Sequence, residues 1–341
     1  MYRIFKPILF RCDPENAHHF SLLLMRLVGA SHLLRGVLSW VYRAPQEPVN
    51  ILGLTFPNPI GIAAGFDKDG QAWQGLSCLG FGHVEIGTVT PQPQPGNPRP
   101  RLYRLPQDRA LINRMGFPGK GADYVKKQLA GWHPNGLILG INLGVNKDTP
   151  LEQAADDYRQ LIYAFASLAN YLVINISSPN TVGLRRLQAK EILDELLSDL
   201  NQVRVNQCSV LGRPVPLLVK LAPDLTDLEL DDALDIIQSR QIDGVIATNT
   251  TVSRQGVNSI DARESGGLSG APLRNLSTEM VRKIFQRTQG QLPIIGVGGV
   301  MNVDDVKEKL DAGASLVQIY TGLIYEGPGL GKRINWGLSR F

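Results

Sequence analysis

Polar side chains follow nearly every short apolar run between residues 60 and 322 of this 341-residue chain. Most are amides, hydroxyls or lysines, and the set comprises Lys68, Thr88, Asn142, Asn175, Ser178, Asn180, Lys220, Thr248, Asn249, Thr250, Tyr320 and Thr321. An amide offers both a donor and an acceptor without adding charge, so it can bind the edge of a planar heterocycle. A single Asn or Thr also caps helices, but capping hardly explains so many. The pattern favours a pyrimidine or flavin ring over a sugar phosphate chain.

Glycine-rich segments form a second candidate site. Gly296-Val-Gly-Gly299 and Tyr320-Thr321-Gly322 end the last two apolar runs, and Gly266-Gly-Leu-Ser-Gly270 follows an earlier one. Glycine lets the backbone approach a ligand closely, and backbone N–H groups at helix starts bind anions. Glycine-rich turns are equally common without a ligand. The segments therefore form either a phosphate cradle or ordinary turns.

Metal and hydrolytic chemistry are not indicated. The five histidines and three cysteines lack ligand spacing; they are His18, His19, His32, His83, His133, Cys12, Cys78 and Cys208. His83 and His133 are better explained as core or surface residues. Asp67 and Asp69 flank Lys68 and can pair with cations instead of acting as acid and base. We therefore expect an organic cofactor to carry any difficult chemistry.

Eight apolar runs alternate with amphipathic segments from about residue 50 onward. The expected strands are Ile60–Ala63, His83–Gly87, Leu137–Leu143, Tyr171–Asn175, Val215–Leu221, Gly244–Ala247, Pro293–Val297 and Ser315–Tyr320. The expected helices include Leu151–Ala169, Glu191–Val205, Asp227–Arg240, Thr278–Gln289 and Val303–Ala312. Strands that are apolar on both faces are typical of parallel sheets covered by helices. No GxGxxG turn follows the first strand, so a (β/α)8 TIM barrel is favoured over an open doubly wound sheet. The carboxyl ends of its strands would bring the polar residues to one mouth.

The region before the barrel differs in character. Residues 14–43 show apolar residues at helical spacing with a break near Gly29-Ala30-Ser31, which predicts two short amphipathic helices. Asp13-Pro14 supplies a helix start. Arg26, His32 and Arg35 interrupt the stretch, so it is not expected to span a bilayer. The helices either pack on the protein or lie in a membrane interface. We expect an N-terminal segment, residues 1–45, and a catalytic barrel, residues 46–341.

Composition sets only broad limits. The chain is 43% hydrophobic and 19% charged, with a net charge of +4, as expected for an ordinary globular protein with a large core. This mild charge gives no reason to expect a nucleic-acid partner. The N-terminus lacks a secretory signal, and the unpaired cysteine pattern favours a reducing compartment.

Five motifs identify a resemblance. They read Ala-Ala-Gly-Phe-Asp-Lys-Asp-Gly (63–70), Glu-Ile-Gly-Thr-Val-Thr-Pro-Gln-Pro-Gln-Pro-Gly-Asn (85–97), Asn-Arg-Met-Gly-Phe (113–117), Asn-Ile-Ser-Ser-Pro-Asn-Thr (175–181) and Gly-Gly-Leu-Ser-Gly-Ala-Pro-Leu (266–273). In these motifs the chain resembles dihydroorotate dehydrogenases, and the resemblance runs from about residue 11 to 328. Ser178 stands at the base position; the soluble class carries cysteine as its base, in a loop elsewhere on the chain, and no cysteine here lies near a strand end. The N-terminal helical pair is typical of the quinone-dependent class, which favours a membrane surface for residues 14–43.

The resemblance implies FMN as cofactor and (S)-dihydroorotate as substrate, in de novo pyrimidine (UMP) biosynthesis. The implied FMN residues are Ala64, Gly65, Phe66, Asp67, Lys68, Thr88, Asn142, Asn175, Lys220, Thr248, Gly270, Gly299, Tyr320 and Thr321. The implied orotate residues are Lys68, Asn113, Arg114, Met115, Gly116, Phe117, Asn175, Asn180, Asn249 and Thr250. His18 and Arg101 are candidates for the inner end of a quinone passage, although Arg101 could equally be a surface cation. The implied location is the cytoplasmic side of the inner membrane, as a peripheral protein without an obligate protein partner.

The expected chemistry follows from the substrate. Oxidation removes a hydride, which goes to the flavin, and a proton from the carbon beside a ring carbonyl, which needs a base. A serine hydroxyl is a poor base at its ordinary pKa, so we expect Ser178 to be oriented and linked to water or Thr181. Two rival hypotheses remain: a soluble dihydroorotate dehydrogenase that uses fumarate or a nicotinamide partner, and a non-redox, phosphate-dependent barrel whose N-terminal helices dock a protein.

Overall fold

The computed structural model describes residues 2–131, 133–134 and 136–339. Its centre is a closed barrel of eight parallel strands in the order β10-β12-β13-β3-β4-β7-β8-β9. The strands are β3 (Ile60–Ile62), β4 (His83–Val89), β7 (Ile138–Leu143), β8 (Tyr171–Asn175), β9 (Leu217–Leu221), β10 (Gly244–Ala247), β12 (Ile294–Val297) and β13 (Leu316–Ile319). Every residue of these strands is buried, as parallel strands between a lumen and a helix layer must be. All eight predicted strands and the TIM-barrel fold are confirmed.

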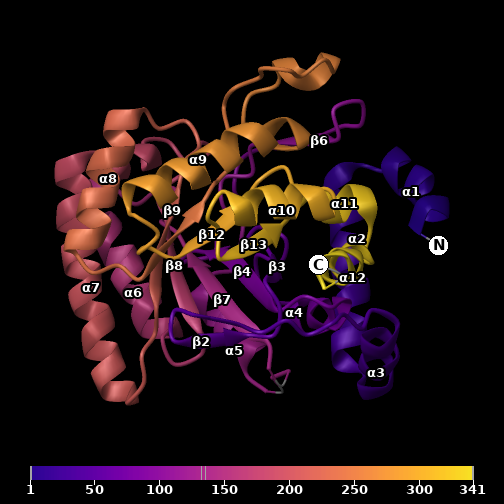
Figure 1. The fold of residues 1–341 in the computed structure, drawn as a ribbon, viewed down its shortest axis with the longest axis horizontal. Coiled ribbons are helices and arrows are strands. Elements are labelled where there is room, and N and C mark those ends of the chain that lie inside the picture. The colour runs from indigo at the N-terminus through magenta and orange to yellow at the C-terminus, as the bar shows by residue number, and fades with distance from the viewer. Residues whose placement is uncertain (1, 132, 135, 340–341) are drawn as a thin grey trace.

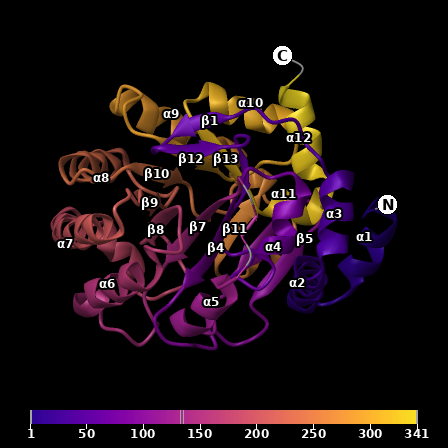
Figure 2. The ribbon, with the colours of Figure 1, turned by 90° about the horizontal axis from the view of Figure 1, so that it is seen from below.

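Helices surround the barrel, as the view along its axis shows (Figure 2). They are α5 (Ala122–Leu129), α6 (Ala154–Phe165), α7 (Lys190–Leu211), α8 (Asp227–Ser239), α9 (Arg274–Arg287), α10 (Val303–Asp311) and α12 (Leu330–Leu338). Short 3-10 turns join several of them: η1 (Ser77–Leu79), η2 (Leu151–Gln153), η3 (Leu184–Gln188), η4 (Ile260–Arg263) and η5 (Ala271–Leu273). The five predicted helices are confirmed, with shifts at their ends. Thr226 and Asn302 begin α8 and α10 with capping boxes, which explains why these two starts were readable from sequence.

A hairpin closes the amino-terminal end of the barrel. Strands β1 (Val49–Ile51) and β2 (Leu54–Phe56) pair antiparallel, and Phe56 packs with Tyr171 and Leu218 in a core cluster inside the lumen. His83 is fully buried beside the Phe56 ring at 5.3 Å, so its predicted role as a core histidine is consistent with its position. The sequence analysis did not predict this hairpin.

A small antiparallel sheet lies at the opposite end of the barrel. It consists of β5 (Leu102–Leu105), β6 (Ala110–Asn113) and β11 (Gly267–Gly270), in the order β11-β6-β5. The glycine-rich segment that was expected as a turn is therefore mostly a strand, because its backbone groups pair with β6. A Cβ on Gly267 would lie 1.9 Å from Thr250 Oγ1. Glycine is thus required for the strand to pack against the loop after β10.

The N-terminal segment forms three helices on one side of the barrel (Figure 1). They are α1 (Tyr2–Arg11), which was not predicted, α2 (Pro14–Ala30) and α3 (His32–Val41). Helices α2 and α3 are the predicted pair; their break falls at Ser31, whose hydroxyl accepts from Leu34 N at 3.3 Å. One face of α2 packs on α4 (Trp73–Leu76), while α1 contacts α11 (Thr321–Glu326).

Large apolar side chains cover the outer surface of this segment. They are Ile4, Phe5, Ile8, Phe20, Leu23, Leu24, Leu27, Leu33, Leu34, Val37, Trp40 and Val41. In the described part of the chain, no single helix is long and apolar enough to cross a bilayer. Only α2 and α3 together have the length and composition, and they are bent by 110°. The segment thus packs on the barrel through one face and exposes an apolar surface on the other.

Candidate active site

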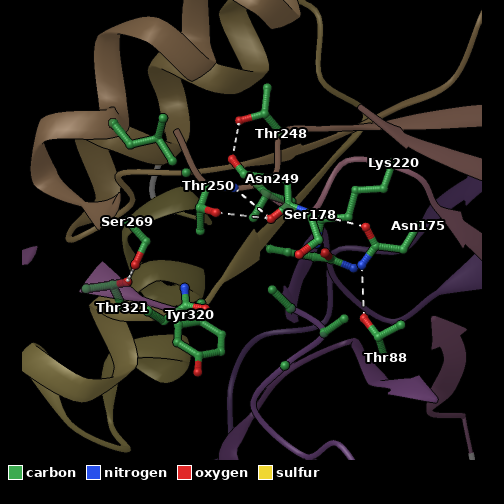
Figure 3. Close-up of a pocket in the computed structure, with 18 of the residues that line it drawn as sticks. Thr88, Asn175, Ser178, Lys220, Thr248, Asn249, Thr250, Ser269, Tyr320 and Thr321 are labelled. Atoms are coloured by element: carbon green, nitrogen blue, oxygen red, sulfur yellow. Dashed lines mark hydrogen bonds between the residues drawn. The ribbon is translucent and has the colours of Figure 1, made fainter. Parts of the chain in front are cut away.

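One pocket at the mouth of the barrel gathers most of the predicted site residues (Figure 3). Those that line it are Ala64, Gly65, Lys68, Thr88, Asn113, Met115, Gly116, Phe117, Asn175, Ser178, Asn180, Lys220, Thr248, Asn249, Thr250, Gly270, Gly299, Tyr320 and Thr321. They come from the carboxyl ends of the barrel strands and from the small sheet above them. The carboxyl ends of the strands therefore meet at one mouth, as the parallel topology predicts.

Four of the residues predicted for FMN or orotate do not line this pocket. Asp67 is buried and accepts from Gln71 N at 2.9 Å and Ala72 N at 2.7 Å, so its carboxylate holds the loop after β3 together. Burial raises the pKa of Asp67 to about 6, although these backbone hydrogen bonds oppose the rise. The Arg114 guanidinium instead contacts Glu264 and Tyr103. Phe66 lines a separate cavity.

Asn142 is the fourth, and it lies directly beneath the pocket without any exposed surface. Its Oδ1 accepts from Thr88 Oγ1 at 2.6 Å and from Asn175 Nδ2 at 3.0 Å. Asn175 Oδ1 in turn accepts from Asn249 Nδ2 at 3.2 Å. The amides from β7, β8 and the β10 loop thus form one connected network, which fixes the orientation of the two that face the pocket.

The floor of the lumen contains polar residues that the sequence analysis missed. Glu85 and Gln318 are fully buried, and Gln318 also lines the pocket. Gln318 Nε2 donates to Glu85 Oε2 at 2.7 Å. The available signal was a charged residue inside an otherwise apolar strand, since Glu85 is the third residue of β4. Buried charges almost always have partners, so this position merited a functional interpretation.

Two lysines supply positive charge to the pocket. Burial lowers the pKa of Lys68 to about 8, against the opposing effect of Asp69, and Lys68 Nζ donates to Gly65 O at 2.8 Å. Burial also lowers the pKa of Lys220, while the charge of Glu85 partly restores it. A desolvated ammonium attracts an anion more strongly than an exposed one does. The pocket is therefore suited to anionic ligands.

Ser178 is buried in the loop after β8, within the pocket. Its Oγ accepts from Asn180 N at 3.3 Å, and Asn180 Nδ2 donates to Asn113 Oδ1 at 3.0 Å. Asn180 is thus the residue that orients Ser178 here, and the expected link to Thr181 is not among the hydrogen bonds of the described residues. Because the Ser178 oxygen accepts the backbone N–H, its proton stays available for another acceptor.

A glycine turn after β12 forms one wall of the pocket. Gly298 and Gly299 have φ values of 126° and 76°, and a Cβ on Gly299 would lie 2.3 Å from Arg274 Cα. Only glycine fits there. In the same pocket, the Ser269 and Thr321 hydroxyls are 2.8 Å apart. Backbone N–H groups and hydroxyls without an opposing carboxylate suit a phosphate group.

The fit of a flavin mononucleotide can be tested on this pocket. It combines the glycine turn, which a phosphate requires, with amides for the edge of a ring. Gln318 Oε1 is buried and has no partner among the described residues. Since an unpaired buried acceptor is costly, an N–H group of a bound ring would satisfy it. The residues present therefore fit FMN.

A second, mostly apolar cavity lies between α2 and the barrel. Its lining includes Phe10, Met25, Phe66, Leu76 and Leu323 among the apolar residues, and His18 and Arg104 among the polar ones. Tyr320 lines both cavities. The rings of His18 and Phe66 lie 5.1 Å apart, and those of Phe66 and Tyr320 5.8 Å apart. A chain of rings therefore connects the apolar cavity with the pocket.

Of the two residues predicted for the quinone passage, His18 lies in this cavity and Arg101 does not. His18 lines it as expected, and burial lowers the pKa of His18 to about 3, with Lys68 adding to the effect. Arg101 does not line the cavity; it is 8% exposed and binds Glu15 through two nitrogens, at 2.7 and 3.2 Å. The alternative that Arg101 is a surface cation is therefore wrong. Arg104, three residues further along the chain and within β5, is the guanidinium that reaches the cavity.

The fold and the pocket together are those of a β/α barrel whose mouth is suited to a flat heterocycle and an anionic group. The family model described as dihydroorotate dehydrogenase matches residues 48–341, and the chain belongs to this family. The rival of a non-redox barrel is thereby excluded.

Curated relatives and solved structures agree with the family assignment. The chain is 47% identical over 334 residues to a dihydroorotate dehydrogenase (quinone) of Shewanella woodyi, with 98% of this chain and 97% of the relative covered. A protein of the same name from Paraburkholderia phymatum is 48% identical over 331 residues, covering 97% and 95% of the two chains. The crystal structure of an Eimeria tenella dihydroorotate dehydrogenase in complex with ferulenol superposes with a TM-score of 0.87 at 38% identity, covering 97% of this chain and 93% of that one.

Proposed function

We propose that this pocket binds FMN beside (S)-dihydroorotate, and that electrons pass from the substrate through the flavin to a membrane quinone. The family membership makes the chain a flavin-dependent dihydroorotate dehydrogenase of pyrimidine biosynthesis. Its relatives named dihydroorotate dehydrogenase (quinone) support a quinone as the acceptor. The choice of FMN among flavins is supported by the glycine turn and the hydroxyl pair at the pocket wall.

The observation that carries this proposal is the convergence of Ser178, Lys220 and Asn249 in one pocket. They come from three different strand ends, β8, β9 and β10. A serine that could act as a base, a cation and a heterocycle-binding amide are the groups that oxidation of a pyrimidine acid requires.

We assign the two ligands to neighbouring parts of the pocket. The residues proposed for FMN are Ala64, Gly65, Thr88, Asn175, Lys220, Thr248, Gly270, Gly299, Tyr320 and Thr321. The residues proposed for orotate are Lys68, Asn113, Met115, Gly116, Phe117, Asn175, Asn180, Asn249 and Thr250. Asp67, Arg114 and Asn142 support the walls from outside, because their side chains bond to other parts of the chain.

The chain's own residues orient the substrate and handle its proton. Lys68 offsets the substrate carboxylate, and Asn249 and Asn180 bind the ring edges. Ser178 removes the proton from the carbon beside a ring carbonyl and passes it toward solvent. Bound FMN would supply the acceptor for the hydride of the neighbouring carbon, so that one proton and one hydride would leave in a two-electron oxidation. Lys220 stabilises the negative charge that reduction creates.

We further propose that the apolar cavity receives the quinone. Its lining suits an apolar tail, and His18 and Arg104 supply two polar groups for quinone oxygens. A histidine whose pKa is lowered to about 3 stays neutral and can donate or accept. Tyr320 and Phe66 lie between this cavity and the pocket, so the second half-reaction has a short path.

Residues 1–45 are proposed as the membrane-associating and quinone-access segment, and residues 46–341 as the catalytic domain. The apolar outer surface of α1, α2 and α3 supports a peripheral position in a bilayer interface. The cytoplasmic face of a bacterial inner membrane is the location that fits best with bacterial relatives.

The test is a two-step anaerobic experiment with purified protein. Dihydroorotate should bleach the flavin absorbance in a single turnover, and a ubiquinone should then restore it. Extraction of the cofactor should release FMN rather than FAD, as judged by chromatography. A colourless protein without affinity for FMN would contradict the proposal.

A further inference from the structure

Glu85 lies fully buried in the lumen directly below the pocket floor. Three donors surround its carboxylate. Asn142 Nδ2 donates to Oε1 at 2.8 Å, while Gln318 Nε2 and Tyr171 OH donate to Oε2 at 2.7 and 3.2 Å. Glu85 does not touch the pocket itself. Its hydrogen bonds reach a ligand only through these neighbours among the described residues, and its charge also acts on Lys220 in the pocket.

A carboxylate accepts hydrogen bonds and cannot donate them. Asn142 and Gln318 must therefore both turn their NH2 groups toward Glu85, which points their amide oxygens elsewhere. The Asn142 oxygen accepts from Thr88 Oγ1 at 2.6 Å and from Asn175 Nδ2 at 3.0 Å. The Gln318 oxygen is left buried without a partner among the described residues. Gln318 lines the pocket, so this oxygen is an acceptor at its floor.

The same orientation of donors and acceptors extends to the residues that face the pocket. With its NH2 group committed to Asn142 and Thr88, Asn175 presents Oδ1 to Asn249 Nδ2 at 3.2 Å. Asn249 then turns Oδ1 toward Thr250 N at 2.8 Å. Every donor in the series points toward Glu85, and every acceptor points away from it. The carboxylate stands at one end of this series, and the Thr250 backbone at the other.

We propose that Glu85 is a positioning residue that fixes the donor and acceptor pattern of the pocket floor, and that it holds Gln318 Oε1 as an acceptor for an N–H group of the bound ring. The inference deepens the proposed function, because that ring is the flavin or the pyrimidine. Glutamine at position 85 has nearly the same shape but carries one NH2 group of its own. Either Gln318 or Asn142 must then reverse its amide. The reversal places a donor where the pocket floor had an acceptor.

The experiment compares Glu85→Gln with wild-type protein and with Tyr171→Phe as a matched control. Tyr171→Phe removes one donor to Glu85 but leaves the carboxylate and both amides in place. FMN affinity is measured by fluorescence titration of apoprotein, and orotate affinity by calorimetry on the flavin-loaded protein. We expect Glu85→Gln to weaken at least one of these about tenfold, the usual consequence of one lost or mismatched buried hydrogen bond. Tyr171→Phe should stay within about twofold of wild type, a difference of about 0.4 kcal/mol.

A double variant separates positioning from mere packing. In the double variant Glu85→Gln with Asn142→Asp, the carboxylate, which can only accept hydrogen bonds, stands at position 142 instead of position 85. The new carboxylate accepts from Thr88, Asn175 and the glutamine NH2, while the glutamine oxygen accepts from Tyr171 and Gln318. The proposal expects affinity to recover to within about threefold of wild type. It is overturned if Glu85→Gln binds both ligands normally, or if the double variant binds no better than Glu85→Gln. Failure of wild-type protein to bind FMN would instead reject the proposed function.

Discussion

At the scale of single residues, the pocket depends on a serine that is buried and held by its own loop. The Asn180 N–H fixes the Ser178 oxygen, and none of the described acidic or histidine side chains lines the pocket to act as an alternative base. Ser178→Ala should therefore leave the flavin bound and slow its reduction by dihydroorotate by several orders of magnitude. Anaerobic stopped-flow absorbance would measure the rate. Ser209→Ala, at an exposed position on α7, is the control, and an unchanged reduction rate in Ser178→Ala would remove Ser178 from the role of base.

Lys68 makes substrate affinity depend on pH. Its pKa is lowered to about 8 by burial, so the free protein loses this charge as the pH rises above 8. The bound carboxylate favours the protonated form, and orotate affinity should thus fall by up to about tenfold per pH unit above 8. Calorimetric titrations between neutral and alkaline pH would show the slope. Lys68→Met should bind weakly at neutral pH and lose most of the slope, whereas the exposed Lys127→Met should keep it; a flat profile in wild type would contradict the assignment.

At the scale of elements, a buried ion pair attaches α2 to Arg101, the residue just before β5. Glu15 is 4% exposed and accepts from Arg101 through both oxygens, with Arg99 at 2.9 Å. Burial tends to raise the pKa of Glu15, but the two guanidinium groups outweigh this and lower it. Arg101→Met leaves a buried carboxylate with one exposed partner. Such a loss costs about 3–5 kcal/mol.

The expected result is a local effect on the N-terminal segment. Limited proteolysis should cleave Arg101→Met within residues 1–45 faster than wild type, and the thermal transition should move down. The Arg99 side chain is 55% exposed, so Arg99→Met should cost less than about 1 kcal/mol. Equal effects of the two substitutions would contradict the assignment of Arg101 as the anchor.

The glycine turn after β12 rests on a buried lysine of α10. Lys309 has no exposed surface and donates to Ser277 Oγ at 2.6 Å and Thr278 Oγ1 at 3.1 Å. Ser277 Oγ in turn donates to Gly298 O at 3.0 Å. Burial lowers the pKa of Lys309 from 10.5 to about 7. Between these two values the unfolded chain binds more protons than the folded one, so the free energy of unfolding rises with pH.

The slope in this interval should reach about 1.4 kcal/mol per pH unit for this group. Lys309→Met should lose that contribution, which comparison of urea denaturation at pH values near neutral and near 9 would measure. Lys127→Met, at an exposed lysine of α5, should retain the wild-type slope. Identical slopes in wild type and Lys309→Met would show that Lys309 is not charged differently in the two states.

At the scale of the whole molecule, the barrel could be predicted because its signals are local. Each strand is a short apolar run and each helix is amphipathic. Asn175 ends β8, and Asn249 lies two residues beyond β10. Features that depend on pairing between distant segments were missed, namely the β1–β2 hairpin and the sheet in which β11 pairs with β6. Arg101 was named for the quinone passage, whereas Arg104, which lines the cavity, was not considered. Which of the two faces the cavity is decided by the packing of α2, which sequence spacing does not reveal.

The exposed apolar surface of α1–α3 gives the molecule one distinctive side, and its role can be tested without removing the segment. Leu33, Val37 and Trp40 lie on α3, and Trp40 is 77% exposed. Changing all three to serine should reduce co-sedimentation with vesicles of phosphatidylethanolamine and phosphatidylglycerol, because burial of each side chain in the interface contributes about 1–3 kcal/mol. Turnover with a long-tailed ubiquinone in vesicles should fall in parallel, while turnover with a short, water-soluble quinone and flavin reduction by dihydroorotate stay unchanged. Val182→Ser with Ile260→Ser, at exposed apolar positions outside this segment, is the matched control. If the triple variant sediments with vesicles as wild type does, this surface does not mediate contact with the bilayer.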